Sequence, residues 1–253
     1  MHSVSSQVLT LIIFVIPVLF AISFHEAAHG YVARFFGDST AADEGRVSIN
    51  PLRHIDPLGT VLLPMVAYWL IQLPFGYAKP VPVDFSRLGN RRRDAAFVAF
   101  AGPAANLAMG LLWALFALLV GVRQPVLYQM AQAGILVNAA MFVFNMIPVP
   151  PLDGGEILMS LLPRRFARKM EAIRLPLAKP KKTIRLMRHI MPYWLLKRAV
   201  RVELYDLCIF MLFLMLMKFH VLDKVLAKGI QSVVKAFKSV VLPFFKILSS
   251  TFT

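Results

Sequence analysis

The chain has 253 residues and a net charge of +15, with 58% of the residues hydrophobic and only 16% charged. Soluble domains usually carry about a quarter charged residues, so the composition excludes an ordinary soluble domain and indicates a polytopic membrane protein. The only cysteine, Cys208, excludes an intrachain disulfide and a cysteine-rich zinc site.

The N-terminal segment is predicted to form one long helix, from about Ser5 to Phe36. Residues 8–24 are apolar apart from Thr10 and Ser23, which is close to the shortest stretch that crosses a hydrocarbon core about 30 Å thick. The segment also resembles a signal peptide, but it lacks a start rich in Lys and Arg and runs directly into "FHEAAHG". We therefore expect it to be a retained span.

The motif "HEAAH" ends this apolar segment. On a helix, His25 and His29 lie four residues apart on one face, so one Zn²⁺ can bind a nitrogen of each. Glu26 projects beside them as a candidate general base. The alternative is a chance match, but ionisable side chains inside an apolar span are costly and therefore functional by default. The motif predicts a metal site.

A polar loop is predicted after the first helix, at residues 37–59, with a short strand at "GRVSIN" (45–50). The apolar run that follows, residues 60–74, is short, and Pro64 and Pro74 interrupt it. A run of this length favours an incomplete crossing of the membrane.

The segment "GYAKPVPV" (76–83) is predicted to be extended, because proline suits an edge strand and not a helix interior. Such an edge is one way to hold a substrate segment extended. Together with the short run before it, this indicates that residues 58–83 dip into the membrane and return to the same side, as a re-entrant helix and an extended return.

Two further spans are predicted at residues 95–122 and 126–147. The first contains "AGPAANLAMG", whose small residues let helices approach closely, and the second ends abruptly at "PVPPLDGG". A weaker apolar run follows at residues 204–219. The tail from Asp223 carries lysines among apolar residues, which is typical of an amphipathic helix lying on a membrane surface.

A strongly basic segment, residues 163–201, holds 13 of the 28 Lys and Arg residues and a single acid, Glu171. A basic loop beside spans is typical of the cytoplasmic side, where it lies against anionic lipid. Binding to nucleic acid is the alternative for any basic patch. We favour the cytoplasmic loop and expect no nucleic-acid partner.

The two histidines leave a catalytic zinc site incomplete, because such a site has three protein ligands and an open position for water. Asp153 is the candidate third ligand, since it follows an apolar span and precedes Gly154 and Gly155. Irregular backbone at membrane depth is tolerated only inside protein or beside a wet cavity, and the glycines permit a close backbone approach or a positive φ. The alternative is an ordinary turn at the membrane surface.

The motifs "HEAAHG" and "NMIPVPPLDGG", in this order and membrane setting, resemble the site-two protease family of intramembrane zinc metalloproteases. The stretches "GRVSINPLRHIDPLGT", "GYAKPVPV" and "AGPAANL" are similar to patterns of its small bacterial members, and the resemblance covers roughly residues 10–160. It implies one zinc ion per chain, with these roles: zinc ligands His25, His29 and Asp153, general base Glu26, and Asn145 near the scissile carbonyl.

Two candidate catalytic residues keep alternatives. Asn145 has an amide that can stabilise an oxyanion, or it bonds the backbone at the end of its helix. The resemblance brings His54 near the site, where it would bind substrate, guard the zinc or help stabilise an intermediate. The alternative is a loop histidine bonded to Asp56 or to the backbone.

The sequence thus predicts an all-α polytopic membrane protein with three parts: a helical metalloprotease core (1–160) with a short re-entrant helix and β-strand segment, a basic cytoplasmic loop (161–202), and a C-terminal membrane segment with an amphipathic tail (203–253). The expected function is zinc-dependent cleavage of a transmembrane or juxtamembrane helix of a membrane protein substrate. The expected location is a bacterial cell membrane, with the active site toward the cytoplasm. A zinc transporter would instead place ligands in a chain through the membrane, and an inactive scaffold would have lost Glu26 or a ligand.

Overall fold

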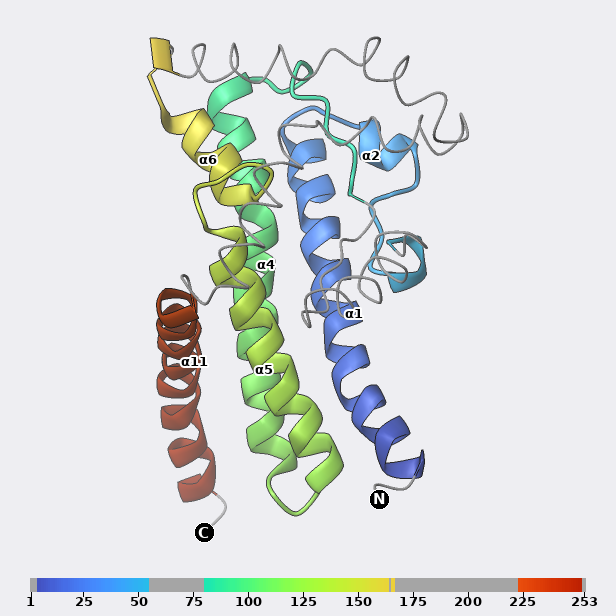
Figure 1. Ribbon diagram of the computed structural model, residues 1–253, viewed down its shortest axis with the longest axis vertical. Helices are drawn as coiled ribbons and strands as arrows, with labels where there is room; N and C mark the ends of the chain where they lie inside the picture. The colour runs from blue at the N-terminus through green and yellow to red at the C-terminus, as the bar shows by residue number, and fades with distance from the viewer. Residues whose placement is uncertain (1–3, 55–79, 164, 167–222, 252–253) are drawn as a thin grey trace.

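A computed structural model describes residues 4–54, 80–163, 165–166 and 223–251 (Figure 1). This part of the chain is helical and contains no strand. Its elements are α1 (Val4–Phe35), α2 (Thr40–Asp43), the 3₁₀ helix η1 (Pro51–Arg53), α4 (Arg91–Val120), α5 (Pro125–Asn145), α6 (Asp153–Leu161) and α11 (Asp223–Thr251). Figure 1 shows α1, α4 and α5 side by side, with α11 along the bundle and α6 at one end. The predicted helical core is confirmed.

The three predicted spans correspond to α1, α4 and α5, which are each long and apolar enough to cross a membrane. Helix α4 begins earlier than predicted because the side chain of Asn90 accepts a hydrogen bond from the backbone N–H of Arg93 and caps it. Helix α5 begins with Pro125, whose missing N–H costs nothing in a first helical turn. This architecture therefore fits an integral membrane protein.

Helices α1 and α4 run in opposite directions. His29 of α1 lies against Val98 of α4, while Ala21, two turns earlier, lies against Asn106. The C-terminal end of α1 and the N-terminal end of α4 therefore lie at the same end of the bundle. Tyr31 and Arg93 thus lie near the same end of the bundle. The path of the predicted re-entrant segment lies outside the described residues, except for residues 80–83.

Glycines allow the helices to pack closely, as the small residues of "AGPAANLAMG" predicted. A β-carbon at Gly110 would lie less than 3.0 Å from the ring of Phe237 on α11, and one at Gly134 would collide with the indole of Trp113. Small residues at such contacts permit the close approach that holds membrane helices together.

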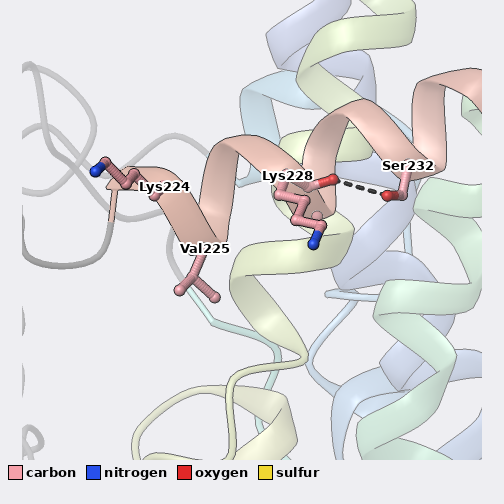
Figure 2. Close-up of a pocket in the computed structure, with 5 residues that line it drawn as sticks. Lys224, Val225, Lys228 and Ser232 are labelled. Atoms are coloured by element: carbon pink, nitrogen blue, oxygen red, sulfur yellow. Dashed lines mark hydrogen bonds between the residues drawn. The ribbon is translucent and has the colours of Figure 1, made fainter.

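The C-terminal helix α11 corrects the expectation of a tail lying on a membrane surface. Its residues Phe237 and Val241 are buried against α4 and α5, in a cluster with Ala114, Ala117, Ala131, Ile135 and Ala139. Bulky side chains on one face of α11 thus fit the small residues of two spans. Lys224 and Lys228 of α11 are exposed. The hydroxyl of Ser232 donates to the backbone carbonyl of Lys228 at 2.8 Å (Figure 2).

Two predicted strands are absent from the described residues. Residues 45–50 form a turn and irregular backbone, in which the carbonyl of Ser48 is bound by His54 and the side chain of Asn50 caps η1. Residues 80–83 pair with no strand either. Their prolines remove ladder donors, and the one N–H between those prolines bonds a side chain of α1 instead.

A buried aspartate fixes the chain on either side of this region. Asp38 accepts hydrogen bonds from the backbone and hydroxyl of Thr40 and, at 2.7 Å, from the backbone N–H of Asp84. Burial raises the pKa of the Asp38 carboxyl, but these hydrogen bonds together lower it further, so its pKa lies below the ordinary value. The carboxylate thereby ties residues 80–84 to the end of α1.

Candidate metal centre

The structure brings the three predicted ligands together. His25 and His29 come from α1, and Asp153 opens α6. The Nε2 atoms of the two histidines are 3.1 Å apart. The carboxylate of Asp153 lies 3.2 Å from Nε2 of His25 and 3.5 Å from Nε2 of His29. All three ligand atoms lie within 4.8 Å of one another, so residues 128 positions apart in sequence converge on one point.

The hydrogen bonds of the two histidine rings keep their protons on Nδ1, away from the Nε2 atoms that face Asp153. His29 donates from Nδ1 to the backbone carbonyl of Val98 at 2.7 Å, and His25 Nδ1 lies 2.6 Å from the amide oxygen of Asn106. In each neutral ring, Nε2 then carries a lone pair. Oδ2 of Asp153 is buried and accepts no hydrogen bond from the residues that the structure describes. Two lone pairs and a carboxylate therefore face one another, an arrangement that fits a cation with nitrogen and oxygen ligands such as Zn²⁺.

Gly102 of α4 lies directly beside the ligand cluster. A β-carbon there would lie less than 3.0 Å from Nε2 of both His25 and His29. The missing side chain thus leaves room beside the two ligating nitrogens. The sequence contained this residue within "AGPAANL", where it was interpreted only as a helix contact.

The two glycines after Asp153 allow it to lie close to the backbone that leaves α5. A β-carbon at Gly154 would lie 2.5 Å from the carbonyl oxygens of Met146 and Ile147, and one at Gly155 would collide with the backbone of Pro150. Helix α6 can therefore start directly against the chain that leaves α5. The predicted close backbone approach at these glycines is confirmed.

The candidate base, Glu26, accepts a hydrogen bond at Oε2 from the backbone N–H of Val81, at 2.8 Å. Val81 lies between Pro80 and Pro82, neither of which has an N–H. The only backbone donor of this three-residue stretch is thus directed at the carboxylate beside the ligands.

Asn145 and His54 have ordinary partners in this structure. The amide of Asn145 donates to the carbonyl of Met141 at 3.0 Å, within its own helix, which leaves its second N–H available to another acceptor. His54 is buried, and its Nε2 lies 2.6 Å from the carbonyl of Ser48. Its backbone partner agrees with the structural alternative, and neither residue belongs to the ligand cluster found in the described part. Their catalytic roles stay predictions.

Two functional candidates were missed from the sequence. Asn106 and Asn138 are fully buried on α4 and α5, and Asn106 contacts a predicted metal ligand. The signal was present, because each is a polar residue within an otherwise apolar span. Such residues find partners on neighbouring helices or at functional sites.

Comparisons with known proteins agree with this site. A family model described as "Peptidase family M50" matches residues 121–176, which include Asp153. YwhC of Bacillus subtilis, named as a candidate zinc metalloprotease, is 34% identical over 164 residues, which cover 62% of this chain and 72% of YwhC. Rip2 of Mycobacterium tuberculosis is 33% identical over 143 residues, covering 55% of this chain and 53% of Rip2. MJ0611 of Methanocaldococcus jannaschii is 28% identical over 156 residues, covering 60% and 72%; both are named in the same way. No solved structure gives a significant match.

Proposed function

The chain belongs to peptidase family M50, and from this premise we propose that it is an intramembrane endopeptidase, which cleaves a transmembrane or juxtamembrane segment of another membrane protein. The coarser assignment is that of a zinc metalloprotease, since the relatives carry that name. The cluster of His25, His29 and Asp153 fits the metal.

The observation that supports cleavage inside the membrane is the depth of the cluster along the helices. His25 precedes the end of α1 at Phe35 by ten residues, and Gly102 follows the start of α4 at Arg91 by eleven. At 1.5 Å per residue, the cluster lies about 15 Å along the axes from these ends. It thus lies within the parts of α1 and α4 that are apolar enough to cross a membrane.

The proposed reaction is hydrolysis of a peptide bond. Bound zinc would polarise the scissile carbonyl and make water a nucleophile near neutral pH. Glu26 takes the proton of the attacking water at its carboxylate and passes it to the leaving amine. The N–H of Val81 orients that carboxylate through Oε2. The second N–H of Asn145 is proposed to stabilise the oxyanion, and His54 is proposed to assist substrate binding from the loop after α1.

In the proposed orientation, the end of the bundle formed by the C-terminus of α1 and the N-terminus of α4 faces the cytoplasm of a bacterial cell. Arg34 lies in the last turn of α1, and Arg91, Arg92 and Arg93 open α4 at the same end. Positive residues next to spans favour the cytoplasmic side. The proposed partners are the lipid bilayer and a membrane-spanning substrate.

A reconstituted assay tests this proposal. The full chain in liposomes is mixed with single-span model substrates, and the products are mapped by mass spectrometry. Cleavage within or beside the span, lost on chelation and restored by zinc, is expected. Cleavage that survives chelation would contradict the metalloprotease mechanism. Zinc flux through the liposomes without cleavage would indicate a transporter, and binding of the span without cleavage a scaffold.

A further inference from the structure

Two buried asparagines connect the metal cluster to the packing between helices. Asn106 and Asn138 are fully buried, on α4 and α5. The amide oxygen of Asn106 lies 2.6 Å from Nδ1 of His25, and its amide nitrogen donates to the oxygen of Asn138 at 3.1 Å and to the carbonyl of Ala21 at 3.3 Å. The nitrogen of Asn138 donates to the carbonyl of Gly134 at 2.8 Å.

The two backbone carbonyls determine the direction of this chain of hydrogen bonds. A carbonyl only accepts, so the carbonyl of Gly134 requires the NH₂ group of Asn138 and turns its oxygen toward Asn106. That oxygen and the carbonyl of Ala21 are two acceptors that require the NH₂ group of Asn106. The oxygen of Asn106 must therefore face His25.

The direction of these hydrogen bonds determines which nitrogen of His25 carries the proton. Facing an acceptor, His25 must carry its proton on Nδ1, which leaves the lone pair on Nε2, the atom that lies 3.2 Å from Asp153. We propose that Asn106 and Asn138 form an amide relay that fixes the tautomer and ring orientation of His25 for metal binding. The relay rests on the zinc site of the proposed function and adds two positioning residues to it. Partners of this kind tune the metal affinity of the ligands they hold.

The competing explanation is that both asparagines only hold the helices together. Asn138 distinguishes the two explanations, because its hydrogen bonds are to Asn106 and Gly134 and not to a ligand. Ser23 offers a matched control. It is buried two residues before His25 on α1, and among the described residues its hydroxyl bonds only its own helix, at the carbonyl of Leu19.

The experiment measures zinc affinity and zinc release to a competing chelator on the purified full chain, with thermal unfolding recorded separately. Asn106→Leu should weaken zinc binding about 10- to 100-fold. Asn138→Leu should weaken it less, because Asn106 keeps the carbonyl of Ala21. Asn106→Asp retains an acceptor for Nδ1 of His25 and should stay closer to wild type than Asn106→Leu. Ser23→Ala should leave the affinity unchanged. Leu variants that fold and bind zinc as tightly as wild type would overturn the relay.

A second measurement does not depend on whether the asparagine variants fold. In the zinc-loaded wild-type chain labelled with ¹⁵N-histidine, the signals of His25 should show a protonated Nδ1 and a metal-bound Nε2, with the assignment made from the signals lost in His25→Gln. Zinc bound through Nδ1 of His25 would overturn the relay. Neither readout uses substrate, so a chain with an intact relay that cleaves no membrane segment would contradict only the proposed function.

Discussion

The backbone N–H of Val81 donates to Oε2 of Glu26 at 2.8 Å, although the two residues lie 55 positions apart in sequence. The base of the proposed reaction is thus held by a segment that is itself tied to the end of α1 through Asp38 and Asp84. Pro80 and Pro82 keep this segment extended and supply no donor of their own.

Removing this N–H should slow turnover without removing the metal. Val81→Pro deletes the donor, and a hydrogen bond to a charged group contributes about 1.5–3 kcal/mol, so a loss of about 10- to 100-fold in kcat is expected. Val81→Ala keeps the N–H and controls for the lost side chain, which packs close to Gly30. Turnover and zinc content should be measured on the same preparations. Equal kcat in the Pro and Ala variants would show that the bond does not orient the base.

Glu26→Gln should abolish hydrolysis while zinc stays bound. Gln is nearly isosteric and still accepts a hydrogen bond from Val81, but it cannot take the proton of water, and general base catalysis contributes about 10²- to 10⁴-fold. The measurement pairs zinc content with turnover of a membrane substrate. Turnover near the wild-type rate in a zinc-loaded variant would remove Glu26 from the role of base.

Gly102→Ala should expel the metal and spare the fold of the bundle. The added carbon would lie less than 3.0 Å from both ligating Nε2 atoms, so either the histidines rotate away or the cation loses its room. Gly110→Ala is the matched control on the same helix, since its new carbon would meet Phe237 of α11 instead. That variant should unfold at a lower temperature and keep its zinc. Full zinc occupancy in Gly102→Ala would place the metal elsewhere.

Acid should loosen the loop that carries Val81. Burial raises the pKa of Asp38, but hydrogen bonds from Thr40 and Asp84 lower it below its ordinary value of 3.8. A carboxyl with a lowered folded-state pKa stabilises the fold above its unfolded-state pKa, and this contribution is lost as the pH falls through the folded-state value. Stability should therefore fall below about pH 4. Asp38→Asn should lower the free energy of unfolding at pH 7 and should weaken its dependence on pH in the acidic range. Unfolding measured at a series of pH values tests both. An unchanged pH dependence would exclude Asp38 as its source.

The sequence predicted the helices from apolar runs of span length, and the pairing of His25 with His29 from HExxH, whose spacing is set by the helix repeat. Asp153 was a candidate third ligand because it follows an apolar span and precedes two glycines, and the structure places it beside the histidines. The strand expected at residues 45–50 was wrong, since side-chain contacts from Arg46, Asn50 and His54 organise that loop in place of a partner strand. The packing of α11 was missed because an amphipathic pattern does not tell whether lipid or protein covers the apolar face. The hydrogen bonds of His25 with Asn106 and of Glu26 with Val81 were missed because these residues are distant in sequence.

The last prediction concerns topology. Since α1 and α4 are antiparallel, Arg34 and Arg91 lie at one end of the bundle, and Arg123, in the turn between α4 and α5, lies at the other. The basic segment 163–201 follows α6 in the sequence, and positive residues next to spans favour the cytoplasmic side, so the end with Arg34 and Arg91 should face the cytoplasm. Single cysteines are placed at Arg91, Arg123 and Arg174 in a Cys208→Ser background and labelled with an impermeant thiol reagent from each side of inside-out and right-side-out vesicles. Arg91 and Arg174 should label from the cytoplasmic face and Arg123 from the opposite face. Labelling of Arg91 and Arg123 from one face would mean that α4 does not cross the membrane. Labelling of Arg91 only from outside would reverse the orientation and move the metal site to the extracytoplasmic half.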